Sequence, residues 1–242
     1  MTSVKEHYDN LLAEHYLWMS GDYDAKIKEN RVFFETTGIK PNSGGRALDL
    51  GCGPGYQSIV LAELGFTVLS IDLSDRLLSV LRGRSSDLEI ETVQGDILDS
   101  SLYVHKRPFE LAVCMGDTLT HLQAMDELVA LFESVFESLE DGGRFIVTFR
   151  DLSVELAGVD RIVPIRSDES KIMVTFLEYE HDHVNVHDII FVKGKSEWQL
   201  KKGVYKKLRI GADRVQHLLE KVGFEISSKR SEHNFSIIVA RK

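Results

Sequence analysis

Apolar residues along the chain follow two spacings, one typical of buried strands and one typical of helices that pack on a sheet. The clearest helix is expected at 124–139, where the apolar residues fall on one face. Short apolar runs alternate with helices over the first 150 residues. They predict strands at 47–50, 66–72, 88–93, 109–115 and 144–150, with further helices at 56–64 and 75–81. Five strand–helix units in series favour a parallel sheet with helices on both faces.

The pattern changes after residue 160. Three strands joined by short turns are expected there, at 171–180, 184–192 and 197–208, which is typical of antiparallel pairing. A helix at 212–222 and strands at 224–230 and 234–240 follow. We therefore expect an α/β fold with a doubly wound, Rossmann-like sheet, mostly parallel and seven-stranded, and an antiparallel β insertion.

These changes divide the chain into three parts. Residues 1–45 are expected to form polar helices rich in aromatic side chains, and residues 161–208 the β insertion. Residues 46–160 and 209–242 are expected to form the core. The length of 242 residues suits one α/β domain with such an insertion.

The composition narrows the range of partners. The chain has 29 Lys and Arg against 38 Asp and Glu, a formal charge of −9, which repels phosphate backbones and anionic lipid. Neither nucleic acid nor a membrane is therefore an expected partner, and no stretch approaches the roughly 20 apolar residues of a membrane span. Cys52 and Cys114 lack metal-ligand spacing and suit a reducing compartment. Because the N-terminus lacks the apolar run of a signal peptide, we expect a cytoplasmic protein.

The most informative segment is Asp49-Leu50-Gly51-Cys52-Gly53-Pro54-Gly55, where the first strand ends and a helix begins. Ligands of doubly wound sheets bind at such strand ends, and glycine lets the backbone approach a ligand with no Cβ in the way. Tyr56 stands where the dinucleotide fingerprint G-x-G-x-x-G would continue, and no Lys-Ser/Thr pair follows to form a P-loop. Asp49 would repel a pyrophosphate, so the loop favours a ligand without phosphate.

Two further acids follow at strand ends. Asp72 ends the second strand, 21 residues after Gly51, where a carboxylate can accept hydrogen bonds from both hydroxyls of a ribose. Asp96 and Ile97 end the third strand, and Asp96 can accept from an adenine amino group. Each residue alone is typical of an ordinary turn or helix cap. Their order on successive strand ends indicates a nucleoside-binding edge.

With these residues in place, the sequence resembles the class I S-adenosylmethionine-dependent methyltransferase family. The matching segments are 47–55, 68–72, 95–96 and 110–115, within a similarity that covers roughly residues 45–150 and 210–242. The resemblance implies a methyltransferase-type sheet and S-adenosylmethionine as the cofactor. The cofactor-binding residues that it implies are Asp49, Gly51, Gly53, Gly55, Asp72, Asp96, Ile97 and Met115.

Within that family the chain resembles glycine N-methyltransferase-like enzymes that act on small molecules. Trp18 lies in a segment similar to that group's N-terminal cofactor lid, which adds it to the implied cofactor residues. Asp117 lies in a loop similar to the one after the group's fourth strand, and Arg150 ends a strand whose arginine holds the substrate carboxylate. Asp117 replaces an asparagine of that group and Lys26 replaces a lid arginine. Both departures count against glycine itself as the substrate.

Three side chains are candidates for the chemistry, which requires positioning more than acid–base catalysis when the nucleophile is neutral. His121 could accept a proton, given an unperturbed pKa of about 6.5, or could be a packing histidine. Arg150 could bind a substrate carboxylate bidentately, or could form a structural salt bridge with Asp151 or a helix acid. Asp117 could accept a hydrogen bond from a substrate amine.

Two other clusters point less clearly to function. His181, His183 and His187 lie in a predicted hairpin away from the strand ends, so we expect a solvated turn and no metal site. Basic residues are concentrated over 193–209, where they form either a solvated hairpin face or a contact with RNA.

The sequence therefore predicts an S-adenosylmethionine-dependent methyltransferase that N-methylates an amino acid-like small molecule. The alternatives are O- or S-methylation of a small acid, methylation of RNA or protein, and a non-catalytic cofactor-binding regulator. The acceptor, the methylated atom and the oligomeric state are left open, and a homo-oligomer is compatible with the sequence.

Overall fold

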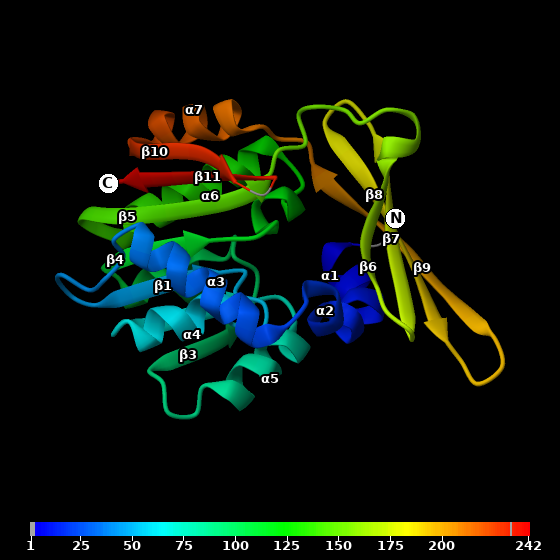
Figure 1. Cartoon of the computed structure of the whole chain (residues 1–242). Helices are drawn as coiled ribbons and strands as arrows, with labels where there is room; N and C mark the ends of the chain where they lie inside the picture. The colour runs from blue at the N-terminus through cyan, green and yellow to red at the C-terminus, as the bar shows by residue number, and fades with distance from the viewer. Residues whose placement is uncertain (1–2, 233) are drawn as a thin grey trace.

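The computed structural model describes residues 3–232 and 234–242 and contains two sheets (Figure 1). The larger sheet has seven strands in the order β10-β11-β5-β4-β1-β2-β3. These strands are β1 (Arg46–Leu50), β2 (Thr67–Asp72), β3 (Ile90–Gln94), β4 (Phe109–Cys114), β5 (Leu139–Arg150), β10 (Glu225–Glu232) and β11 (Phe235–Arg241). Strands β1 to β5 pair in parallel, whereas β11 is antiparallel to both of its neighbours. The predicted doubly wound, mostly parallel sheet is confirmed.

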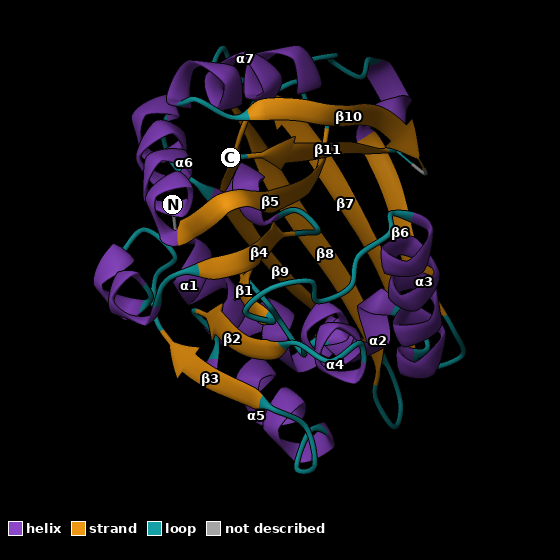
Figure 2. Ribbon diagram, turned by 90° about the vertical axis from the view of Figure 1, so that its left-hand side faces the viewer, coloured by secondary structure: helices purple, strands orange, loops and turns teal. Residues whose placement is uncertain are grey.

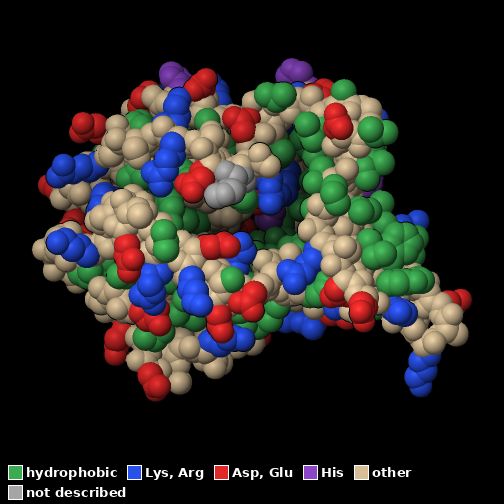
Figure 3. Space-filling view, viewed as in Figure 1, with side chains coloured by type: hydrophobic (Ala, Val, Ile, Leu, Met, Phe, Trp, Pro, Cys, Tyr) green, Lys and Arg blue, Asp and Glu red, His purple; other side chains and the backbone are tan. Residues whose placement is uncertain are grey.

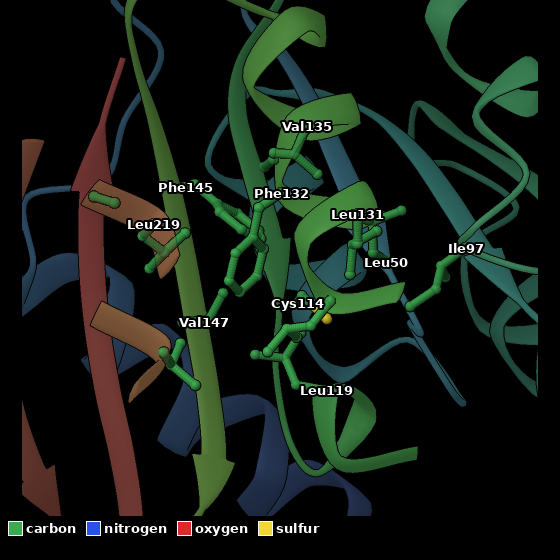
Figure 4. Close-up of a cluster of buried hydrophobic side chains, with 14 of the residues drawn as sticks. Leu50, Ile97, Cys114, Leu119, Leu131, Phe132, Val135, Phe145, Val147 and Leu219 are labelled. Carbon is green, nitrogen blue, oxygen red and sulfur yellow. The ribbon is translucent and has the colours of Figure 1, made fainter. Parts of the chain in front are cut away.

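Helices cover both faces of this sheet, as Figure 2 shows. The helices are α3 (Tyr23–Thr36), α4 (Tyr56–Glu63), α5 (Asp75–Arg84), α6 (Met125–Ser138) and α7 (Ala212–Val222). Helices α6 and α7 pack on one face in the largest hydrophobic cluster, and α3 and α4 pack on the other. Figure 4 shows Phe132 of α6 beside Phe145 of β5, with Val147 and Leu219 close by. The two phenyl rings lie 5.9 Å apart between centroids in an edge-on arrangement, which adds to the apolar area they bury.

The start of β5 differs from the sequence expectation. The strand begins at Leu139 rather than at residue 144, so Gly142 and Gly143 lie inside it. The pairing with β4 shifts register between Phe109 and Leu111, and Gly142 there has φ +81°. A bulge that uses glycine's conformational freedom therefore absorbs the extra residues without ending the strand.

The smaller sheet is the predicted antiparallel insertion, and it has four strands instead of three. They are β6 (Ile162–Ser167), β7 (Lys171–Tyr179), β8 (His183–Lys193) and β9 (Trp198–Leu208), paired in that order. Strand β6 was not expected from the sequence. It is an edge strand that contains Pro164 and a register shift next to it, and an edge strand tolerates proline because one side of its backbone needs no ladder partner.

The N-terminal segment (residues 3–36) consists of α1 (Val4–His7), a π-helical turn (Tyr8–Leu12), α2 (Ala13–Ser20) and α3. Gly21 separates α2 from α3 with φ +101°. Helices α1 and α2 lie against the antiparallel sheet, beside the carboxyl ends of the parallel strands (Figure 1). No helix among the described residues is both long and apolar enough to cross a membrane.

A buried pair fixes the N-terminal segment to the antiparallel sheet. His7 Nε2 lies 2.9 Å from Asp188 Oδ2, and both side chains are about 97–98% buried. Thr175 Oγ1 donates to Asp188 Oδ1 at 2.7 Å, and the imidazole stacks on the Tyr205 ring at 4.4 Å. Gly203 makes room for this contact, because a Cβ there would lie 2.7 Å from His7 Cε1. The segment is thus held by a satisfied polar contact inside an apolar cluster.

We predict that Asp188→Ala lowers the free energy of unfolding by about 1–3 kcal/mol, since His7 and Thr175 would both lose a buried hydrogen-bond partner. Urea unfolding measures this loss. Asp182→Ala serves as the control, because that carboxylate is exposed and pairs with an exposed His181. Equal stability of the two variants would contradict the importance of this contact.

Candidate functional site

The candidate site lies at the edge of the large sheet where β1, β2 and β4 end. Asp49, near the end of β1, is in register with Ser70 on β2 and Val113 on β4. The loops that follow these strands therefore lie side by side, at the position where doubly wound sheets bind ligands. Figure 3 shows the molecule hollowed between the helical core and the antiparallel sheet, with Lys or Arg side chains at the rim.

The glycine loop turns tightly over the end of β2. The backbone N–H groups of Gly51 and Cys52 both donate to the Ile71 carbonyl, at 2.8 and 3.0 Å. Gly51, Gly53 and Gly55 all have positive φ, which residues with a Cβ rarely adopt. The loop conformation therefore accounts for all three glycines of the motif.

The three glycines face different surroundings. A Cβ at Gly51 would lie 2.4 Å from Thr118 Cγ2, and one at Gly55 would lie 2.2 Å from Leu81 Cδ1. At Gly53 the nearest atom would be the Tyr16 hydroxyl oxygen, 3.9 Å away. Gly51 and Gly55 are thus required for packing as well, whereas Gly53 leaves backbone that a ligand could approach.

Asp72 is held directly beneath this loop. Gly53 N–H donates to Asp72 Oδ2 and Ser74 N–H donates to Oδ1, both at 2.8 Å. Burial raises the pKa of Asp72, and the two backbone hydrogen bonds oppose that rise. Each carboxylate oxygen keeps one lone pair free, because an ionised carboxylate offers about four acceptor positions. Asp72 can therefore accept two hydroxyl groups of a ribose side by side.

Asp49 lies behind the loop rather than in contact with its open face. It is 1% exposed, and its Oδ2 accepts a hydrogen bond from Ser58 Oγ at 2.5 Å. Ser70 Oγ donates to Ser58 in turn, at 2.9 Å. Burial raises the pKa of Asp49 to about 7. The structure thus assigns Asp49 to a buried hydrogen-bond chain that supports the start of α4.

The remaining residues expected at the cofactor lie at or just after the ends of β3 and β4. Gly95 N–H donates to the Asp72 carbonyl at 3.0 Å, which brings the loop after β3 to the glycine loop. Asp96 is exposed, and its Oδ1 accepts from Leu98 N–H at 3.0 Å. Ile97 is buried in the main core, and Met115 follows β4 at the same edge of the sheet. The loop after β3 therefore adjoins Asp72, whereas Met115 lies two strands away in the sheet order, at the end of β4.

Trp18 is placed elsewhere. Its indole N–H donates to Asp168 in the turn between β6 and β7, and its ring packs with the antiparallel-sheet cluster. Tyr16, two residues earlier on α2, is the aromatic residue that reaches Gly53. Two residues along a helix turn the side chain by roughly 200°, so Trp18 and Tyr16 point to opposite sides.

Two further contacts dock the N-terminal segment on the glycine loop. Tyr23 Oη donates to the Pro54 carbonyl at 2.9 Å, and Ser20 Oγ and Tyr56 Oη lie 2.6 Å apart. The segment therefore closes over the loop from α2 and α3, as a lid would, and Tyr16 is its innermost side chain there.

A largely buried carboxylate, with 13% of its side chain exposed, lies next to this loop and pairs with two cations. Asp117 Oδ2 accepts from Lys207 Nζ at 2.7 Å and from the Arg150 guanidinium, while Oδ1 accepts from Arg150 backbone N–H at 3.1 Å. Burial alone would raise the pKa of Asp117, but the Lys207 and Arg150 charges hold it well below its ordinary value. Asp117 is therefore ionised, and the trio carries a net charge of +1. Arg150 pairs with Asp117 rather than with Asp151, whose Oδ2 accepts from Ala212 N–H at the start of α7.

His121 ends a 3₁₀ turn (Thr118–His121) beside this trio. Its imidazole meets the rings of Tyr8 and Tyr205 edge-on, at 5.6 and 5.7 Å. Burial, followed by repulsion from Lys207, lowers the pKa of His121 to about 3. The imidazole is therefore neutral near pH 7 and a weak base.

Lys207 is the site residue that the sequence analysis missed, because it falls within the basic run 193–209. On β9 the side chains alternate between faces, and Tyr205 and Lys207 are buried. Lys206 points the other way and pairs with Glu180 at 2.9 Å. The buried aromatic two positions before Lys207 is the signal that could have separated it from its exposed neighbours.

The three histidines of the hairpin region have separate partners. His181 pairs with Asp182, His183 Nε2 lies 2.8 Å from the Gln123 carbonyl, and His187 lies 3.2 Å from Glu178. Their rings therefore serve three different local contacts.

Residues 47–143 match a family model described as a methyltransferase domain. A glycine/sarcosine N-methyltransferase from Aphanothece halophytica is 26% identical over 156 residues, covering 62% of this chain and 58% of that protein. A mitochondrial ubiquinone biosynthesis O-methyltransferase from Schizosaccharomyces pombe is 27% identical over 225 residues, covering 81% of this chain and 78% of that protein. The chain spans 41% and 40% of the length of two other curated relatives, which are 33% and 38% identical to it.

Among solved structures, the fold matches that of CalS10 with SAM bound, an amino pentose methyltransferase from Micromonospora echinaspora. The TM-score is 0.73 at 15% identity, and the match covers 94% of this chain and 95% of that one. This likeness confirms the predicted fold class, including the insertion, because almost the whole chain is matched.

The buried Asp49 gives a testable pH dependence. Its pKa is about 7 in the folded protein against an ordinary value of 3.8, so the folded state binds this proton more tightly than the unfolded chain does. The resulting stability is fully present below about pH 4 and is lost as the pH rises toward 7. We predict that Asp49→Asn makes the fall in the free energy of unfolding between pH 4 and pH 7 smaller by about 2–4 kcal/mol.

Urea unfolding at pH 4, 5, 6 and 7 measures the effect, with the exposed Asp87→Asn as a control that should follow the wild type. If D49N and wild type lose stability in parallel over this range, Asp49 does not titrate as described.

Proposed function

We propose that the chain is a class I S-adenosylmethionine-dependent methyltransferase that methylates an amine nitrogen of a small molecule that also bears an anionic group. The observation that carries this proposal is the Asp117–Lys207–Arg150 trio beside the glycine loop. It offers a fixed anion and a half-exposed cation within one site. A substrate with an amine and a carboxylate would match both.

The residues at the strand ends fit S-adenosylmethionine, which has a ribose, an adenine and no phosphate. Asp72 would accept from both ribose hydroxyls, Gly53 would let the cofactor approach the backbone, and Asp96 and Ile97 would adjoin the adenine. Tyr16 would cover the cofactor from the lid side. When bound, S-adenosylmethionine supplies a methyl group on a sulfonium, which a nucleophile can accept by direct displacement.

Arg150 is the group that we assign to the acceptor's anionic end. Its side chain is 51% exposed, whereas that of Lys207 is 9% exposed. Arg150 can therefore turn to a ligand while Asp117 keeps its ion pair with Lys207. A guanidinium binds a carboxylate through two parallel hydrogen bonds. Asp117 would then accept an N–H of the acceptor's amine, which turns the nitrogen toward the cofactor.

Neither candidate base is strong. The pKa of His121 is about 3, and that of Asp117 is below its ordinary value, so both bind protons weakly at neutral pH. The amine would therefore react in its unprotonated form, and positioning would provide most of the acceleration. Tyr8, Tyr205 and the neutral His121 would line the apolar side of this pocket and exclude water.

The relatives support an amine acceptor without identifying it. Two of the three named proteins, the glycine/sarcosine N-methyltransferase and the amino pentose methyltransferase, have amines in the substrates that their names give. The ubiquinone biosynthesis O-methyltransferase keeps O-methylation as the second candidate. RNA is less favoured, because the net charge is −9 and Lys207, from the basic run, is buried inside the site.

We predict that Asp72→Ala weakens binding of S-adenosylhomocysteine by about 1.5–3 kcal/mol, the usual range for hydrogen bonds to a charged group. Calorimetric titration of both proteins measures the difference. Asp87→Ala, at an exposed position, should bind as wild type does. Unchanged affinity in D72A would remove Asp72 from the cofactor site.

We further predict that Arg150→Ala lowers kcat/KM for the acceptor by the equivalent of about 1.5–3 kcal/mol and leaves the affinity for S-adenosylhomocysteine unchanged. The acceptor is first identified by screening metabolites for release of S-adenosylhomocysteine. Arg161→Ala, at the end of the 3₁₀ turn (Gly158–Arg161) that precedes β6, is the matched control. If the best acceptor has no anionic group and R150A is silent, the assignment of Arg150 is wrong.

A further inference from the structure

The two cations on Asp117 differ in how firmly they are held. Lys207 is buried and comes from the inward face of β9, where it lies opposite Val184 of β8. Arg150 is at the exposed end of β5, where its guanidinium also lies over the Phe235 ring at 4.7 Å. Lys207 is therefore fixed by the antiparallel sheet, whereas Arg150 is free to change partners.

We propose that Lys207 is a positioning residue: it is the side-chain cation that holds the Asp117 carboxylate in place when the Arg150 guanidinium turns to the acceptor's anionic group. The identity of that acceptor rests on the proposed function, whereas the Lys207–Asp117 contact does not depend on it. It assigns a role to a residue of the insertion in a site that otherwise belongs to the core.

The contacts of Asp117 explain why one side-chain cation is enough. Oδ1 accepts from the Arg150 backbone N–H, which cannot leave with the guanidinium. Oδ2 is shared by the Arg150 guanidinium and Lys207. After Arg150 leaves, each oxygen still has one donor, and one of these donors carries a full positive charge. The freed position on Oδ2 is then available to an amine N–H.

Without Lys207 the same carboxylate would be buried with no fixed cation. Burial raises a carboxyl pKa, and a protonated Asp117 would present a hydroxyl donor in place of an acceptor. The titratable groups that face Asp117 are Lys207 and Tyr205 from β9, Arg150 from β5, His121 from its own loop, and Tyr8 and Tyr16 from the N-terminal segment. His121 is neutral, and burial raises the pKa values of the three tyrosines. Lys207 and Arg150 are thus the positive charges of this group at neutral pH.

The test follows the Asp117 carboxyl by carbon NMR in the full-length protein labelled with ¹³C at aspartate carboxyl groups. The signal is assigned by its absence in Asp117→Asn. In wild type, Asp117 should stay ionised to the lowest pH at which the protein is folded. In Lys207→Met its pKa should rise by about 1–3 units, the usual effect of removing an adjacent opposite charge.

Three variants make the result specific. Arg150→Ala should shift the titration clearly less than K207M, because Lys207 is sufficient. Lys207→Arg should keep the wild-type behaviour, since it restores the charge. Lys206→Met, on the opposite face of β9, should have no effect. If K207M titrates as wild type does, or if R150A shifts Asp117 as much as K207M, Lys207 is not the residue that holds the carboxylate.

If K207M does not fold, Lys207→Gln replaces it: K207Q should raise the pKa of Asp117, K207R should not, and R150A should shift the titration clearly less than K207Q. Binding of S-adenosylhomocysteine is measured on each variant. If the wild-type protein does not bind S-adenosylhomocysteine, the proposed function is wrong. The NMR titration would still test the role of Lys207.

Discussion

The arrangement of the candidate site depends on the cations that balance the charge of one largely buried carboxylate. Asp117 lies where the loop after β4, the end of β5 and the inward face of β9 meet, and each contributes to its environment. A buried charge is costly unless it is paired and hydrogen-bonded. Removal of one partner therefore leaves the other as an uncompensated buried charge. The pairing of Asp117 with Lys207 therefore ties the antiparallel insertion to the core at the candidate site. The same pairing leaves Arg150 as the group with spare binding capacity.

The N-terminal segment completes this arrangement from the third side. His7 and Asp188 fix it to the insertion, and Tyr23 fixes it to the glycine loop through the Pro54 carbonyl. Tyr16 then lies over Gly53. Three parts of the chain that are far apart in sequence thus enclose one site. In the proposed function, strand ends of the core would form the cofactor side, and the core and the insertion together would form the acceptor side.

The fold and the glycine loop were largely predictable from the sequence, because both follow from local patterns. Strand and helix spacing gives the order of elements, and glycines with positive φ must be glycine in that turn. The rest depends on contacts between distant segments. Lys207 looks like its exposed neighbours until β9 is paired and one face is buried. Trp18 and Tyr16 differ only in which side of α2 they occupy. Strand β6 contains a proline, which argues against a strand unless the strand is known to lie at an edge.

Transfer of an isotope-labelled methyl group is the most direct test of the central claim. The protein is incubated with S-adenosylmethionine carrying a ¹³C-methyl group and with a pool of small metabolites, and the products are analysed by mass spectrometry. The account predicts that S-adenosylhomocysteine is released in equal amount with a labelled N-methyl product that carries an anionic group. Label on the protein itself, or no labelled product with S-adenosylmethionine left intact, would contradict it.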